Sequence, residues 1–393
     1  MKKLGLAHLL LLLWIAVLIF RYELFYHISQ LVLSVVSGEI NILKINPRFY
    51  DYLVSFLLFF VLPVAVWKIP ALKNIFQKRL TWLNAFLSLF FVIILFAPLL
   101  STSNPDLHYN IKKCKLLPPF SEVFIESSVG ENAPADSDLY NYFKSEIINR
   151  GISKGAEYYN DGNANEGRRV IFIFGTDEYA RDVYSRILYG TRFAFLLGLG
   201  SVTLSFLIAF VLGLAAGFGG KFWDNLINRF TEIFLSFPFL FLIIVFLAFF
   251  GNSFWVVVLV LGLSGWMGLF KIIRGEILRL KSKDFILSAK MLGIPEYKIL
   301  LKEILPIILS PLLVNLVLQF GNVIMAESAL SFLGFGAGEE YFSWGSMINS
   351  GQYYLSTAWW LSFFPSLFLA VSLLTMNRLG NTLEKVFNPE STK

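Results

Sequence analysis

The sequence predicts an all-α integral membrane protein with about eight transmembrane helices. Of its 393 residues, 56% are hydrophobic and only 15% are charged, and the mean hydropathy is +0.66. A soluble domain carries about a quarter charged residues, so this chain lacks the polar surface that water requires. The hydrophobic residues also fall in long uninterrupted runs, without the helical or strand periodicity of a soluble core.

The hydrophobic runs have the length that a bilayer requires. About 20 apolar residues cross the ~30 Å hydrocarbon layer as a helix. Ile233–Phe270 carries no charge over 38 residues and is interrupted by Gly251-Asn252-Ser253, which predicts a hairpin of two spans. With that hairpin, the eight predicted spans are Leu4–Phe20, Tyr52–Trp67, Trp82–Leu100, Phe193–Phe218, the two halves of Ile233–Phe270, Ile304–Ala326 and Trp359–Met376. The first span resembles a signal peptide, but no small-residue cleavage site follows it, so we expect it to be retained.

The distribution of Lys and Arg between the loops predicts that both termini are cytoplasmic. Short cytoplasmic loops are enriched in basic residues. The loop Lys271–Glu303 holds eight basic residues against four acidic ones, whereas Ser331–Ala358, on the opposite side, holds no Lys or Arg. Arg21, Lys44 and Arg48 are the short-loop exceptions. The net charge of +6 is therefore explained by membrane topology, and we expect no nucleic-acid partner.

The sequence contains no motif for catalysis or cofactor binding. It has no P-loop, no GxSxG, no HExxH and no Cys/His cluster, and its single cysteine, Cys114, cannot form a disulfide within the chain. The later predicted spans hold no ionisable residues, which a secondary transporter would use to couple ions. We therefore expect a chain that is not an enzyme and that binds no cofactor of its own.

A short helix is predicted in the cytoplasmic loop, between Ser282 or Asp284 as its cap and Gly293 at its end. One face of it is expected to carry Phe285, Ser288, Ala289 and Leu292. A helix this short is marginal in water unless it packs against something, so it either docks on a protein or rests on lipid headgroups. A second short helix, Glu296–Glu303, is predicted to lead into Leu305-Pro306 and the seventh span.

Polar residues inside or beside the spans allow two interpretations. Asn315, Gln319 and Asn322 share one helical face, which must turn towards another helix or towards a wet pathway. Hydrogen bonding between helices is the more common outcome, and lining of the pathway is the sharper hypothesis. Glu327 is expected to be a solvated carboxylate at the end of a span. Arg181 and Arg186 are expected to be solvated or to bind an acidic partner outside.

Gly293 with Leu305-Pro306 resembles the cytoplasmic coupling motif of ABC importer permeases, although Leu287 and Ser288 stand where that family has Glu and Ala. Phe174–Arg186 resembles the GTD-x-x-GRD-x-x-SR signature of the dipeptide and oligopeptide branch, with Ala180 in place of a Gly. The matching signature residues are Gly175, Thr176, Asp177, Arg181, Asp182, Arg186, Glu327, Gly334, Trp344 and Gly345. The resemblance extends from about Phe174 to Pro389.

This resemblance implies a type I importer permease in the inner membrane, with membrane lipid around its spans. Its expected partners are a sister permease, two cytoplasmic ATPases and an extracytoplasmic substrate-binding protein. Its expected cargo is a peptide; a nickel chelate, a peptide antibiotic or a scaffold without transport activity remain alternatives. The implied ATPase-coupling residues are Asp284, Phe285, Ser288, Ala289, Leu292, Gly293 and Pro306.

The domain organisation follows from the resemblance. Residues 1–81 form two extra N-terminal spans, and residues 82–190 form the first core span with an enlarged outer loop. The permease core covers residues 191–381 and includes the coupling loop 271–303, and residues 382–393 form a cytoplasmic tail.

Overall fold

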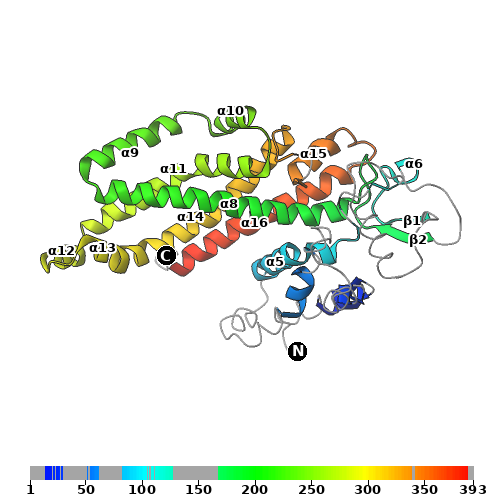
Figure 1. Ribbon diagram of the computed structural model, residues 1–393, viewed down its shortest axis with the longest axis horizontal. Helices are drawn as coiled ribbons and strands as arrows, with labels where there is room; N and C mark the ends of the chain where they lie inside the picture. Colours follow the sequence, from blue (N-terminus) through cyan, green and yellow to red (C-terminus); the bar gives the residue numbers. More distant parts are fainter. Residues whose placement is uncertain are drawn as a thin grey trace, which may run out of the picture. The chain divides into compact units, whose positions relative to one another are not determined.

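The computed structural model describes residues 14–29, 51–61 and 82–126, each with gaps, and residues 167–338 and 341–387 (Figure 1). The described residues are helical apart from one two-stranded sheet. They form two compact units, which are described separately. The first comprises residues up to Arg192 together with Ser350–Pro365, and the second comprises Phe193–Asn349 and the residues from Ser366 onward.

Helix α5, Trp82–Leu100, has the bounds predicted for the third span. Helical turns from residues 14–29 and 54–61 pack against it through a small apolar cluster that includes Phe25, Phe59 and Leu99. The Trp14 indole donates to the Phe59 carbonyl at 3.2 Å, and Arg21 Nε donates to the Leu99 carbonyl at 2.9 Å. Much of the predicted first and second spans lies outside the described residues.

Part of the long segment between α5 and α8 is folded. The short helix α6, Ile111–Cys114, precedes strand β1, Ser121–Glu126, which pairs antiparallel with β2, Gly167–Phe172. Tyr109, Cys114, Phe172 and Ala180 form a buried cluster beside this sheet. Residues 127–166, between the two strands, lie outside the described residues.

Four helices are long and apolar enough to cross a membrane, or five if one bent pair counts as a span, within the part of the chain that the structure describes. The four are α8 (Val183–Phe218), α11 (Phe254–Lys281), α14 (Leu305–Phe332) with the turns that precede it, and α16 (Trp360–Phe387). Each overlaps a predicted span and is longer than predicted. The total of eight spans remains a prediction.

The predicted fifth span differs from the structure. Gly251 ends α10, Phe239–Phe250, with a φ of +83°, so the break within the predicted hairpin is confirmed. However, a separate helix, α9 (Gly220–Leu235), precedes α10 and is bent by 85° from it next to Pro238. Pro238 has an extended conformation and lacks an N–H, which explains why one helix ends and another begins there. The helical segment therefore begins 13 residues before Ile233, a difference that brings charged residues into it.

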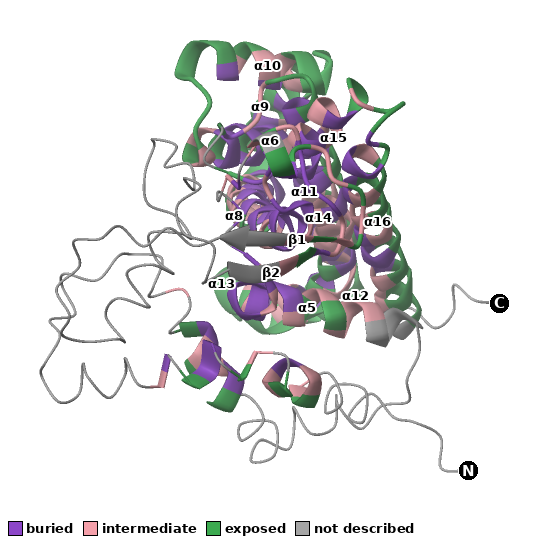
Figure 2. Cartoon of the chain, turned by 90° about the vertical axis from the view of Figure 1, so that its right-hand side faces the viewer, coloured by how far each residue is buried: buried purple, intermediate pink, exposed green. Residues whose placement is uncertain are grey.

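The core of the second unit is centred on α11. Phe270, Ile273 and Ile277 of this helix are buried, and Figure 2 shows buried residues concentrated in α8, α11 and α14. Hydrogen bonds connect these helices: Ser205 Oγ donates to the Gly262 carbonyl, and Gln319 Nε2 donates to the Gly265 carbonyl, both at 2.8 Å. Hydrogen bonds of this kind pair polar groups for which the hydrocarbon layer offers no water.

Helix α9 is fastened to α11 by an ion pair. The Asp224 carboxylate accepts two hydrogen bonds from the Arg274 guanidinium, one of them at 2.8 Å from Nη2. A bidentate pair of this kind fixes orientation as well as distance. Ile227 and Phe234 then pack against the core cluster of α11.

Candidate functional site

The candidate coupling site begins where α11 ends. Helix α12, Asp284–Met291, confirms the predicted short helix. The predicted caps are wrong, because Lys283 occupies the N-cap position without a side-chain bond, and Ser282 Oγ donates back to the Arg279 carbonyl at 2.9 Å. Asp284 instead lies exposed in the first turn, where a carboxylate interacts favourably with the helix dipole.

Gly293 ends α12 as predicted. Its φ is +75°, its N–H donates to the Lys290 carbonyl at 2.9 Å, and the N–H of Ile294 donates to the Ala289 carbonyl at 3.1 Å. These two bonds form a Schellman motif, in which a left-handed residue closes the last turn. Pro295 follows and starts α13, Glu296–Ile299. Glu296 also pairs with Lys290 at 2.8 Å, which holds the two short helices together.

A single side chain anchors α12 to the bundle. Ile286 is fully buried in the same cluster as Ile299 and Ile304, and Ala289 packs against that cluster. The remaining predicted face is turned outward: Phe285, Ser288 and Leu292 are exposed, Leu292 by 80% of its surface. The helix therefore presents an apolar surface that nothing in the described chain covers.

The second predicted short helix continues into α14 without a break. After α13, a π-helical turn at Leu300–Ile304 joins α14, and Pro306 lies in the first turn of α14. Pro306 has no N–H to bond the carbonyl four residues earlier, and a π-helical turn accommodates such a loss. A continuous helical segment thus connects the coupling surface to a membrane span.

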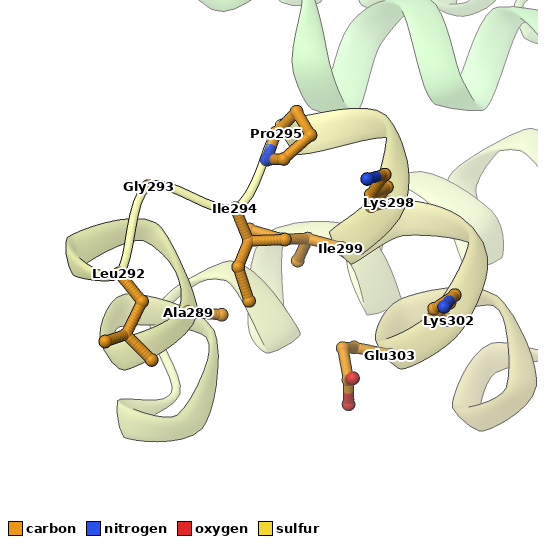
Figure 3. Close-up of a pocket in the computed structure, with 9 residues that line it drawn as sticks. All are labelled: Ala289, Leu292, Gly293, Ile294, Pro295, Lys298, Ile299, Lys302 and Glu303. Carbon is orange, nitrogen blue, oxygen red and sulfur yellow. The ribbon is translucent and has the colours of Figure 1, made fainter.

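A pocket of about 400 Å³ opens beside α12 (Figure 3). Leu292, Gly293, Ile294 and Pro295 form one side of it, together with Ala289, and Lys298, Ile299, Lys302 and Glu303 form the other. Lys298 and Lys302 are one helical turn apart and place two cations at its edge. The pocket is therefore apolar on the α12 side, and its other side carries these two cations and the Glu303 carboxylate.

The signature motif Phe174–Arg186 forms a dense hydrogen-bonded turn in the first unit. Gly175 has a φ of +79°, and a Cβ there would lie 2.8 Å from Trp360 Nε1 and closer still to the Leu117 carbonyl. Thr176 Oγ1 accepts from the Leu117 N–H at 2.8 Å and donates to the Cys114 carbonyl. The Trp360 indole donates to the Thr176 carbonyl at 3.2 Å. Three separate chain segments therefore meet at Gly175-Thr176.

Asp177 organises the next part of the motif. Its carboxylate accepts from the N–H groups of Tyr179 and Arg181 at 2.9 and 2.8 Å, and from Arg181 Nε at 2.7 Å. Arg186 is buried, with Nε 3.9 Å from the same carboxylate. The expectation that both arginines are solvated or bind a partner is therefore wrong. Ala180, where the family has Gly, adopts a φ of +57°.

Asp182 is a fully buried carboxylate at the start of α8. It accepts hydrogen bonds from the hydroxyls of Thr102, Ser103 and Ser185, and from the backbone N–H groups of Tyr184 and Ser185. Burial raises the pKa of Asp182 above its ordinary value, and these hydrogen bonds offset only part of that rise. The residue therefore connects the end of α5 to the start of α8 and faces no open site.

Glu327 is buried as well, with 2% of its surface exposed, so its predicted solvation is wrong. Ser331 Oγ donates to its carboxylate at 2.6 Å, and the hydroxyls of Ser328 and Ser343 also bond to it. Ser343 precedes α15, Trp344–Gln352, whose buried Trp344 and Gly345 pack on the end of α14. Gly334 closes α14 with a φ of +88°. This part of the signature fastens α15 to α14.

The polar stripe of α14 is divided between two roles. Gln319 bonds α11, as described above, and Asn315 Nδ2 donates to the Pro311 carbonyl of its own helix at 2.8 Å. Asn322 is exposed. Lining of the pathway by these three residues stays a prediction.

Comparison with known proteins places the chain in a family. Residues 209–393 match the family model described as binding-protein-dependent transport system inner membrane component. The dipeptide transport system permease protein DppC of Bacillus subtilis is 34% identical over 218 residues, which cover 55% of this chain and 68% of that protein. The oligopeptide transport system permease protein OppC of Haemophilus influenzae is 36% identical over 218 residues, covering 56% and 70%. This chain belongs to that permease family.

The permease is therefore a multi-pass inner membrane protein and a transport component, not an enzyme. A structure of the MetNI methionine ABC transporter in inward-facing form also resembles it, at 16% identity and a TM-score of 0.39, covering 50% of this chain and 95% of that one.

Some residues that matter to the permease were missed in the sequence. Ile286 was not placed on the inner face of α12, although Ile286 and Ala289 are three residues apart, the spacing of neighbours on one helical face. The pairing of Asp224 with Arg274 could not be predicted, since the two residues are 50 positions apart and no local pattern relates them.

Replacing Gly175 with Ala tests whether the outer turn supports the fold of the permease. We expect a lower thermal unfolding temperature in detergent, because the new Cβ is strained by about 1–2 kcal/mol at positive φ and also collides with Leu117 and Trp360. Gly220→Ala is the matched control, since Gly220 has a φ of +83° but no atom near its absent Cβ. Equal losses in both variants would show that backbone strain alone matters and that the close packing at Gly175 contributes nothing.

Proposed function

We propose that this permease forms a translocation path with a sister permease and imports di- or oligopeptides. Two cytoplasmic ATPases supply the energy, and an extracytoplasmic binding protein delivers the substrate. Support for the peptide cargo comes from the names of the relatives, a dipeptide and an oligopeptide permease. The observation that carries the proposal is the exposed apolar surface of α12, anchored to the bundle by Ile286.

The exposed surface of α12 fits a protein partner. Phe285, Met291 and Leu292 are exposed by 45%, 89% and 80%. Clustered apolar side chains on a cytoplasmic loop mark an interaction site. Leu287 stands where the family has Glu, so contact with the ATPase rests here on apolar packing rather than on a carboxylate.

The connection between α12 and the spans explains how force passes to the membrane. Ile286 of α12, Ile299 of α13 and Ile304 before α14 share one buried cluster with α11. A closely packed cluster transmits displacement because its side chains cannot compress. When the ATPases close on ATP, they displace α12, and α11 and α14 follow it as a unit. ATP binds the partners, since this sequence contains no P-loop.

The proposed topology places the coupling segment on the same side of the membrane as the ATPases. Both termini and the α12–α13 segment lie in the cytoplasm, and the sheet of β1 and β2 lies outside. The excess of basic residues in 271–303 and their absence from 331–358 support this orientation. Lipid covers the exposed apolar side chains of the spans.

Variants of the coupling segment test this mechanism. Gly293→Pro removes the N–H that closes α12, and Ala289→Trp forces a large ring between α12 and its core. Both are expected to abolish uptake of a labelled peptide in cells while membrane insertion stays normal. Gly293→Ala is the graded control, because no atom lies near its added Cβ and only the strain of positive φ remains. Normal uptake by Gly293→Pro and Ala289→Trp would rule out coupling through α12.

Affinity purification of the tagged permease in mild detergent tests the function itself. We expect mass spectrometry to identify a second multi-span permease and P-loop ATPases in the purified complex. Recovery of the chain alone, from a preparation that stays folded, would contradict the importer assignment and favour a scaffold. Uptake of a nickel chelate but not of peptides by the intact complex would reassign the cargo.

A further inference from the structure

Helix α9 has three distinct faces. Asp224, Ile227, Thr231 and Phe234 face α11 and its core. Leu226, Phe230, Ile233 and Phe237 form an apolar face, each more than half exposed. Asn225, Arg229, Glu232 and Ser236 form a polar face and are also exposed. The residues of each outer face are spaced four, three and four positions apart, and this spacing places them on one side of a helix.

The polar face lies at membrane depth. Figure 1 shows α9 running beside α11, and two contacts fix the register: Asp224 pairs with Arg274, and the Phe230 ring stacks on Trp266 at 6.5 Å between centroids. Glu232 is eight residues beyond Asp224, about 12 Å along the helix. Glu232 is therefore level with Trp266 of α11. The first charged residue of α11 after Phe254 is Lys271, so Glu232 lies about five residues further into the apolar part of that helix than Lys271.

The charged side chains on this face have defined partners. Glu232 accepts a hydrogen bond from Asn228 Nδ2 at 2.7 Å and pairs with Arg229 at 3.3 Å. Yet Arg229 remains 82% exposed and Glu232 46% exposed. A charged side chain that faces lipid at this depth is strongly unfavourable. Ionisable residues in spans face a bundle interior or a water-filled cavity for that reason. The polar face therefore does not contact lipid. The adjacent apolar face can contact lipid or an apolar partner.

We propose that the polar face of α9 lines the water-filled part of the translocation path and contacts the charged ends of the peptide. This inference rests on the proposed function. Arg229 provides a cation for a terminal carboxylate, and Glu232 provides an anion for a terminal ammonium group. One substrate that carries both charges matches a surface that presents both. The bend of 85° before α10 ends the polar face near Ser236, so the face covers only the cytoplasmic part of the span.

Cysteine accessibility tests the proposal with little background, because Cys114 is the single cysteine, is buried and can be replaced by Ser. Arg229→Cys and Glu232→Cys are compared with their apolar neighbours at the same depth, Phe230→Cys and Ile233→Cys. The assembled importer in inside-out vesicles is treated with a charged, membrane-impermeant thiol reagent. We expect labelling of positions 229 and 232 at least tenfold faster than labelling of positions 230 and 233.

Two results would overturn the inference. Slow labelling at both 229 and 232 would show that another protein covers the polar face, and equal rates on the two faces would place α9 in open water. A complex that retains its ATPases and imports peptide, but labels slowly at 229 and 232, contradicts this inference alone. If the unmodified chain purifies without ATPases and supports no peptide uptake, the proposed function is contradicted instead.

Protection by ligand tests the substrate class. Trialanine, which has free termini, is expected to slow labelling of Asn225→Cys, a polar-face variant that keeps both Arg229 and Glu232, in the same vesicles. Trialanine with an acetylated amino end and an amidated carboxyl end is expected to have no effect at equal concentration. Equal protection by both peptides, or protection by neither, would contradict recognition of the charged ends.

Discussion

The burial of Ile286 is the contact on which the coupling account depends. Helix α12 has eight residues, too few to be stable in water by itself, and Ile286 is its one fully buried side chain. Through Ile299 and Ile304 this side chain joins the cluster that also holds α11 and the start of α14. The same arrangement leaves Phe285 and Leu292 free to contact a partner. The buried Ile286 thus stabilises a helix that would otherwise be marginal, and the exposed side chains remain available for a partner.

The outer signature residues have a different physical task. Asp177, Asp182 and Glu327 are buried carboxylates. Their oxygens accept hydrogen bonds from hydroxyls, backbone N–H groups or arginine. Removing a partner from such a group leaves a buried charge unsatisfied, which costs more than the bond itself contributes. Asp182 joins segments that are distant in the chain, Glu327 joins consecutive helices, and Asp177 closes the turn of its own motif. The motifs by which the family is recognised are therefore largely structural, and the surfaces that act on partners lie elsewhere.

Prediction from the sequence succeeded where local rules decide the outcome. The bounds of α5, the position of α12, the left-handed Gly293 and the break at Gly251 all follow from run length or turn chemistry. It failed where burial decides. Arg181, Arg186 and Glu327 have charges that suggest solvent, but they pair with Asp177 or Ser331, which lie four to nine residues away, and Arg186 and Glu327 are buried in the fold. The start of α9 was missed because its alternating charged and apolar residues do not form a continuous apolar run. The pairing of Asp224 with Arg274 and the packing of Ile227 and Phe234 place that helix against α11.

Crosslinking from α12 in native membranes tests the central claim most directly. A photoreactive amino acid at position 292, which is exposed, is compared with one at position 286, which is buried. The account predicts that position 292 crosslinks to a P-loop ATPase and that position 286 crosslinks only within the permease. Crosslinks from position 292 to lipid alone, in membranes that import peptide, would contradict it and would make α12 a helix that rests on headgroups.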